Sequence, residues 1–221
     1  ASEDEINARE AAGGNNFLLD LENKELRPRP PFDLIGTAPN GAEIRGGFSL
    51  LKSDGSISTC FQAGAAVYEW DGSTGFTPVG TVNSAAKLRG HFRSHNWSLD
   101  DEVLITDLAL AEVVQKWNGS TLSAVSFTNE AASPFGTFYA KYLRIANERA
   151  VFAHVKDGSG TSPHLIVGAK RGDYTVITVT DRPASALSEE DPFFIPSPDL
   201  KPINGMEEAF GTAVLSTEQG A

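Results

Sequence analysis

The sequence is poor in cysteine and in the motifs that mark catalytic or metal-binding chains. Cys60 is the only cysteine among 221 residues, which excludes a disulfide framework and a metal cluster held by several thiolates. The four histidines show no metal-ligand spacing, and the HExxH, GxSxG, GxGxxG and P-loop patterns are missing. We therefore expect no cofactor and no metal, and we expect Cys60 to be a free residue of the core or the surface.

Positive charge and long apolar runs are also scarce. The chain has 18 Lys and Arg against 29 Asp and Glu, which gives a formal net charge of -11. A surface that clasps nucleic acid needs clustered Lys and Arg, whereas an acidic wall would let DNA pass without retaining it. No signal peptide is recognisable, and no apolar stretch is nearly as long as a membrane-spanning helix, which needs about 18 residues. We therefore expect neither specific DNA binding nor a membrane partner.

What the sequence does contain is a repeat. "VYEWDGST" (67–74) and "VVQKWNGST" (113–121) superpose when the chain is shifted by 47 residues, and the match continues backward without gaps. A third copy follows at the same shift through residues 150–155, then gains the loop 156–161 and has Lys170 in place of Trp. A fixed period of this length indicates a repeated supersecondary unit.

Each copy has the pattern of four short antiparallel strands. In the first copy, "FSLLK", "SISTCFQ" and "AVYEWDG" are separated by Asp-Gly and Ala-Gly turns, and "FTPVG" closes it. One such sheet cannot bury an apolar face alone, but stacked sheets can. We therefore predict an all-β domain over 34–221 with β-propeller-like blades at about 46–82, 91–128 and 139–180. A β-sandwich with two accidental similarities is the alternative.

The shared turn residues have structural roles in this prediction. In "VYEW", strand alternation sets Tyr68 and Trp70 on one face and Val67 and Glu69 on the other. The Asp-Gly and Asn-Gly pairs form the turns, and the Trp packs between blades. The candidate blade motif is Trp70, Asp71, Gly72, Trp117, Asn118 and Gly119.

Two segments lie outside the repeat. Residues 1–33 are predicted to be an N-terminal arm with a possible short helix and a Pro-rich piece. Arg27 and Arg29 of this arm either reach a carboxylate or phosphate of a partner or are solvated side chains on a polyproline stretch. Residues 181–205 are predicted to be an insertion. Their apolar cluster either plugs the core or docks on a neighbouring subunit, and its members are Phe193, Phe194 and Ile195.

The last residues, 206–221, resemble the start of a further blade. "LSTEQG" is similar to "LLKSDG" of the first copy, a strand followed by a turn, and the partner strand that should follow is not in the sequence. An unpaired strand edge is a liability that folded proteins avoid. We therefore expect an incomplete propeller, a fragment of a longer chain.

No catalytic site is expected. The acidic groups at 100–102 and 189–191 fall in a predicted turn and in the insertion, and sequence cannot set two of them across one sugar bond as a glycosidase needs. A shift of 47 residues aligns Cys60 with Asp107 and His154, which indicates a variable position and not a nucleophile.

The segments "NNFLLDLENKELRPRPPFDLIGTAPNG", "VYEWDGSTGFTPVG", "ITDLALAEVVQKWNGST" and "MEEAFGTAVLSTEQGA" resemble tail-hub proteins of short-tailed bacteriophages, called nozzle or stabilization proteins. The resemblance covers most of the chain and implies β-propeller domains without catalytic residues. It implies a virion protein that assembles as a homo-oligomeric ring, typically of about six copies. Such a ring lies below the portal and adaptor, continues and closes the DNA channel, and carries fibres or spikes.

Two other functions remain open at this stage. A carbohydrate-binding or host-surface-recognition propeller would stack sugar on Trp70, Trp97 or Trp117. A propeller glycosidase is the third possibility. For the ring, the candidate subunit contacts are Arg27, Arg29, Phe193, Phe194 and Ile195.

Overall fold

The computed structural model describes residues 17–20, 25–28, 36–73, 75–91, 102–129, 131, 134–178, 188–197, 200–209 and 212–217. These residues form strands and turns and no helix, so the predicted all-β class is confirmed for them, and none of them belongs to a helix that could cross a membrane. Contacts divide the chain into residues 1–35 and 36–221, close to the predicted boundary. In the first part, β1 (Phe17–Asp20) and β2 (Glu25–Pro28) form an antiparallel hairpin. The helix expected before it lies outside the described residues.

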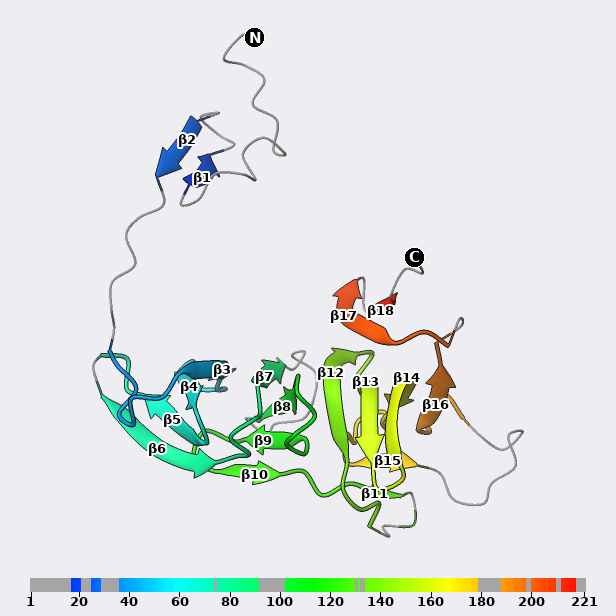
Figure 1. The fold of residues 1–221 in the computed structure, drawn as a ribbon. Helices are drawn as coiled ribbons and strands as arrows, with labels where there is room; N and C mark the ends of the chain where they lie inside the picture. The colour runs from blue at the N-terminus through cyan, green and yellow to red at the C-terminus, as the bar shows by residue number, and fades with distance from the viewer. Residues whose placement is uncertain are drawn as a thin grey trace. The chain divides into compact units, whose positions relative to one another are not determined.

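The first unit of the larger part is a four-stranded antiparallel meander (Figure 1). It consists of β3 (Ile44–Leu51), β4 (Ile57–Ala63), β5 (Ala66–Trp70) and β6 (Phe76–Thr81). Its strands are rich in β-branched and aromatic residues, which fit a pleated surface with one buried face. Gly55 turns β3 into β4 with a φ of 84°, a left-handed conformation that glycine adopts without a steric penalty.

The second unit repeats this meander with β7 (Leu88–His91), β8 (Val103–Asp107), β9 (Gln115–Trp117) and β10 (Leu122–Ala124). Because β7 pairs in parallel with β3, the two units form one eight-stranded sheet in the order β10-β9-β8-β7-β3-β4-β5-β6. Their approach requires Gly46, since a Cβ there would lie 2.3 Å from the carbonyl oxygen of Leu88. The edge strands also meet, with Gly80 of β6 against Leu122 of β10, so the sheet is nearly closed.

A third sheet is separate and contains β12 (Tyr139–Ala146), β13 (Arg149–Asp157), β14 (Gly160–Gly168) and β16 (Phe193–Pro196). β11 (Thr128–Asn129) and β15 (Val176–Thr178) form a short parallel pair, and β17 (Ile203–Ala209) and β18 (Thr212–Thr217) form a hairpin. In Figure 1 the first unit, the second unit and the third sheet follow one another in chain order.

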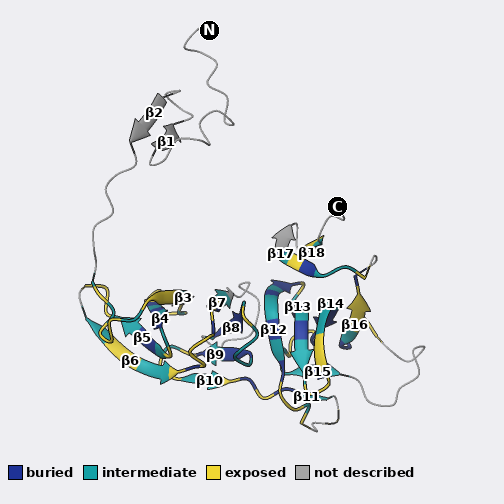
Figure 2. Ribbon diagram, viewed as in Figure 1, coloured by how far each residue is buried: buried dark blue, intermediate teal, exposed yellow. Residues whose placement is uncertain are grey.

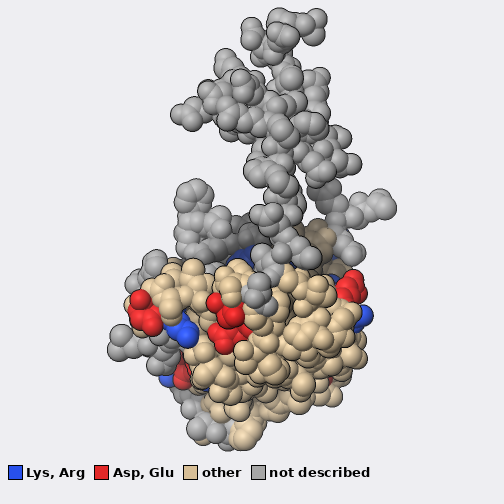
Figure 3. Space-filling model, turned by 90° about the vertical axis from the view of Figure 1, so that its left-hand side faces the viewer, with Lys and Arg blue, Asp and Glu red and all other residues tan. Residues whose placement is uncertain are grey.

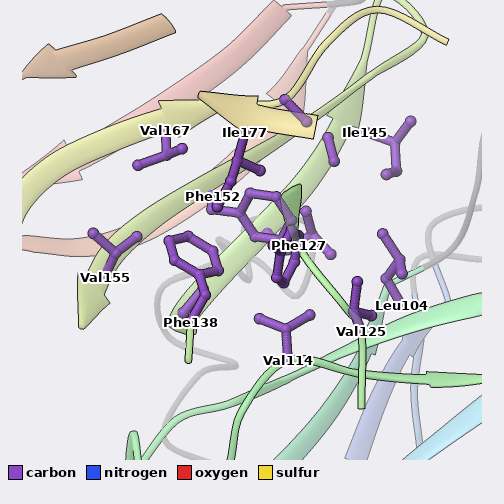
Figure 4. Packing of buried hydrophobic residues seen from close by; sticks show 14 residues of the cluster. Leu104, Val114, Val125, Phe127, Phe138, Ile145, Phe152, Val155, Val167 and Ile177 are labelled. Atoms are coloured by element: carbon purple, nitrogen blue, oxygen red, sulfur yellow. The ribbon is translucent and has the colours of Figure 1, made fainter. Parts of the chain in front are cut away.

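Three apolar cores hold the units, the third sheet and the last hairpin together. The first joins the first and second units and includes Phe48, Cys60, Val67, Ile105 and Trp117. The second joins the second unit and the third sheet, where Phe127, Phe138 and Phe152 meet edge to face with ring centroids 4.9–5.6 Å apart (Figure 4). The third sets Ile203 and Met206 of β17 against the third sheet. Each fully buried large apolar side chain contributes about 1.5–3 kcal/mol, so each sheet is stabilised by its neighbours.

The predicted strand assignments need one correction in the third unit. β15, at the end of the predicted third copy, pairs with β11 and not with β14, because Ile177 is drawn into the second core. The fourth strand of the third sheet is β16, which comes from the segment predicted to be an insertion. Gly168 makes room for this strand, since a Cβ there would lie 2.2 Å from the ring of Phe193.

Candidate functional site

The two motif turns have the same geometry. Asp71 Oδ1 accepts hydrogen bonds from Ser73 N at 2.8 Å, Ser73 Oγ at 2.9 Å and Gly75 N at 3.0 Å, and Gly72 has a φ of 85°. Asn118 Oδ1 accepts from the backbone and hydroxyl of Ser120 and from Thr121 N, and the following glycine has a φ of 84°. The hydrogen bonds from Ser73 and Gly75 lower the pKa of Asp71. The Asp-Gly and Asn-Gly pairs therefore form turns, as predicted, by satisfying local backbone N–H groups.

The two tryptophans of the motif differ in environment. Trp117 is fully buried, its ring lies 6.4 Å from that of Phe48, and its Nε1–H donates to Ser58 Oγ at 2.9 Å. The Ser58 hydroxyl in turn donates to Glu69 Oε1 at 2.6 Å, so a polar chain crosses the first core. Trp70 is half-buried, and its Nε1–H donates to the carbonyl of Ser73 in its own turn. Only Trp117 therefore packs between two described four-stranded units.

Asp107 is a fully buried carboxylate with a complete set of backbone donors. Its Oδ1 accepts from Lys87 N at 2.6 Å and Ala109 N at 2.9 Å, and its Oδ2 accepts from Ala111 N at 2.6 Å and Glu112 N at 2.8 Å. A buried carboxylate is tolerated only when hydrogen bonds replace its hydration. Asp107 therefore holds the end of β8 to the loops around it and is not a chemically free group.

The two residues aligned with Asp107 are held in different surroundings, Cys60 fully buried and His154 half-buried. Cys60 is fully buried in the first core, and burial raises the pKa of its thiol to about 12. His154 lies at a β-bulge with a φ of 54°, and its Nδ1 donates to the carbonyl of Ile203 at 3.0 Å. Burial lowers the pKa of His154, although that hydrogen bond acts in the opposite direction. The three aligned positions therefore hold different residue types because each makes different contacts: Cys60 packs in the first core, Asp107 binds backbone N–H groups, and His154 binds a carbonyl of β17.

Arg149 anchors the strand that the sequence predicted to be inserted. Its guanidinium donates to the carbonyls of Ala169 at 2.5 Å and Asp191 at 2.7 Å, and also to that of Glu189. It lies over the ring of Phe193, 5.2 Å from the centroid, which adds a cation–π contact. No sequence pattern indicates this role, because the acceptors are backbone carbonyls up to 42 residues away.

The residues predicted to contact a neighbouring subunit lie in different environments, some in a core and some exposed. Phe193 packs against the third core, so it is the part that plugs, while Phe194 and Ile195 are 45% and 49% exposed on the edge strand β16. Arg27 lies on β2 opposite Leu18 in the N-terminal hairpin. Arg29 lies outside the described residues, as does Trp97.

The acidic residues singled out by sequence that are described hold structural contacts. Glu102 accepts from Lys116 Nζ at 2.8 Å and from the Tyr174 hydroxyl at 2.6 Å, which ties the second unit to the loop after β14. Glu190 pairs with Arg171, and Asp191 accepts from the backbone and hydroxyl of Ser188. Among the described residues, no group of three or more His, Cys, Asp and Glu could hold a metal ion.

The chain matches no family model, no curated protein and no solved structure.

Proposed function

We propose that this chain is a structural β-propeller-type protein that assembles as a ring, the tail hub of a short-tailed phage virion. The observation that carries the structural role is the packing of three four-stranded parts with an apolar core between each successive pair, and of a two-stranded hairpin on the last of them. The residues that a repeat could have used for chemistry form turns or fill those cores, as Asp71 and Trp117 do. A rigid stack of sheets suits a part that bears load and presents loops.

The assignment to a phage tail rests on the resemblance of the sequence and is supported by its charge. A net charge of -11 suits a wall along which DNA slides, since a negative surface repels phosphate and does not retain it. In this proposal the ring contacts the portal and adaptor at one end and fibres or spikes at the other. Genome DNA passes through without specific binding.

Electron microscopy of the purified full chain tests the proposal. We expect closed rings of about six copies with a central channel, and no retention of duplex DNA at physiological salt. Particles that stay monomeric at all concentrations, or that bind duplex DNA tightly, would contradict it.

A second candidate, a carbohydrate-recognising propeller, now depends on Trp70 alone among the described tryptophans. Trp117 is fully buried and cannot stack on sugar, whereas Trp70 is half-buried at a turn with its indole N–H held by Ser73. A glycan array with the native chain and with Trp70→Ala separates the two functions. Binding that is lost on this substitution would favour recognition of sugar over assembly.

A further inference from the structure

The exposed large apolar side chains of the described residues fall into two groups. The first-unit patch contains Ile44, Leu51 and Ile57, which are 54%, 49% and 68% exposed. The third-sheet patch contains Phe194, Ile195 and Leu200, which are 45%, 49% and 64% exposed. Figure 2 shows exposed stretches on β3 and on β16, which lie far apart in the larger part of the chain. Clustered exposed apolar residues mark interaction surfaces.

The first-unit patch lies on one face of the meander. Leu51 pairs with Ile57 and Ile44 pairs with Ala63 across β3 and β4, so these side chains share the face that carries Trp70. The strand positions of this face in β4, β5 and β6, and those from Gly47 to Leu51 in β3, carry no Asp, Glu, Lys or Arg. Ile44 lies at the other end of β3, next to Arg45, whose guanidinium pairs with Glu43 at 3.5 Å. Figure 3 looks at this end of the molecule and shows uncharged residues over much of its surface, with a few Asp, Glu, Lys and Arg side chains between them. Depletion of charge is typical of the centre of a protein–protein interface.

The same face is covered in the next unit. Trp117, the counterpart of Trp70, is buried against the first unit, and Phe152 of the third sheet is buried against the second unit. Each of these sheets is covered on the side that faces its predecessor. The first unit has its exposed patch on that side.

The third-sheet patch lies on an edge, because the face of the third sheet that points away from the second unit is covered by Ile203 and Met206 of β17. β16 is the last strand of its sheet, with β14 on one edge and no strand paired to the other edge among the described residues. Phe194 and Ile195 project to opposite sides of this edge, because neighbouring strand residues alternate. Leu200 is held nearby in a left-handed conformation with a φ of 53°, which is unfavourable for leucine and presents its side chain to solvent.

We propose that the first-unit patch of one copy binds the third-sheet patch of a second copy, head to tail. The occupant is a second copy, because the equivalent faces of the second unit and the third sheet are covered by apolar residues of this same chain, and the third-sheet patch is the other exposed apolar surface of its described residues. The two patches differ in composition and lie on different sheets, so the contact is heterologous and generates a ring if the rotation closes. This inference rests on the self-assembly in the proposed function and names the surfaces that carry it.

The test uses the full chain and one charged substitution in the most exposed residue of each patch, Ile57→Glu and Leu200→Glu. Burying an unpaired carboxylate in an apolar contact is costly, so each variant is expected to weaken association by about 100-fold or more. Ala124→Glu is the matched control, because Ala124 is an exposed strand residue outside both patches. Circular dichroism and the melting temperature verify that each variant is folded, and Leu51→Glu and Ile195→Glu replace any variant that is not.

Mixing the two variants distinguishes head-to-tail contact from contact between identical patches. The Ile57→Glu copy keeps an intact third-sheet patch, and the Leu200→Glu copy keeps an intact first-unit patch. Sedimentation velocity is expected to show multimers for the native chain and the control, monomers for each variant alone, and pairs of copies for the equimolar mixture. Rings that persist in both variants, or a mixture that stays monomeric, would overturn the patch assignment while leaving the proposed ring standing. A native chain that is itself monomeric would overturn both.

Discussion

The turns at Trp70 and Trp117 have nearly the same sequence and the same hydrogen bonds, yet they lie in different surroundings. Trp117 is fully buried and bonded to Ser58 of the first unit, while Trp70 is half-buried and bonded only within its own turn. Trp117 faces the first unit, whereas Trp70 lies on the face of the first unit that points away from the first core. The difference comes from the position of each turn in the stack, and it shows where the stack has a free face.

The largest expected effect is the difference in unfolding free energy between Trp117→Ala and Trp70→Ala. Trp117→Ala removes a fully buried ring and is expected to lower the free energy of unfolding by about 4 kcal/mol. Trp70→Ala should cost about 1 kcal/mol or less in the monomer, because little packing is lost. Urea unfolding of both variants in the Ile57→Glu background, which keeps the chain monomeric in our proposal, measures the difference. Equal destabilisation by the two substitutions would refute the distinction.

The next effect compares two aligned positions. Asp107→Ala leaves four backbone N–H groups around a buried position without their acceptor and is expected to cost about 3 kcal/mol. Cys60→Ala removes one sulfur atom from an apolar core and should cost about 1 kcal/mol. Urea unfolding again gives both values. A loss of unfolding free energy in Asp107→Ala that is no larger than the loss in Cys60→Ala would show that water replaces the carboxylate as acceptor.

His154, the third residue aligned with Cys60 and Asp107, should make the unfolding free energy depend on pH. Burial lowers the pKa of His154 below its ordinary value of 6.5, so the unfolded chain takes up this proton first as the pH falls. The stability contributed by neutral His154 is complete above pH 6.5 and is lost below it, down to the folded-state pKa. His154→Asn, which tolerates the left-handed backbone, should remove this part of the pH dependence. Unfolding free energies from pH 5 to 8 test this, and an unchanged pH profile would contradict it.

The smallest effect is a protected thiol. Burial raises the pKa of Cys60 from 9.0 to about 12, so the native thiol should not react with Ellman's reagent at pH 8 and should react fully in urea. Between pH 9 and about 12 the unfolded thiol ionises first, so this group lowers stability as the pH rises through that range. Rapid labelling of the native chain would show that the first core opens.

The sequence predicted the all-β class, the turn chemistry and the burial of Trp117, because these depend on local patterns and on one repeat. The ungapped alignment of the repeat did not reveal that aligned residues of β4 and β8 point to opposite faces of their units. Val67 and Val114 both face the next sheet, but Ser58 and Ile105, aligned by the same shift, both face the core between their units. A one-residue offset in a strand turns every side chain to the other face, and an ungapped match cannot reveal it.

The sequence also could not locate β16 or the partners of Asp107 and Arg149. β16 joins its sheet after a gap of 24 residues from β14, between Gly168 and Phe193, and long-range pairing of this kind leaves no local signal. Asp107 and Arg149 bond to backbone groups, which every residue has, so side-chain identity does not indicate them. Arg149 itself was not expected to be buried.

Hydroxyl-radical footprinting of the two motif tryptophans tests the central claim most directly. The account predicts that Trp117 is protected both in the assembled native chain and in the Ile57→Glu monomer, while Trp70 is protected only in the assembly. Oxidation of Trp70 to the same extent in both states, or oxidation of Trp117 as readily as Trp70 in the monomer, would contradict the stacked arrangement with one free face.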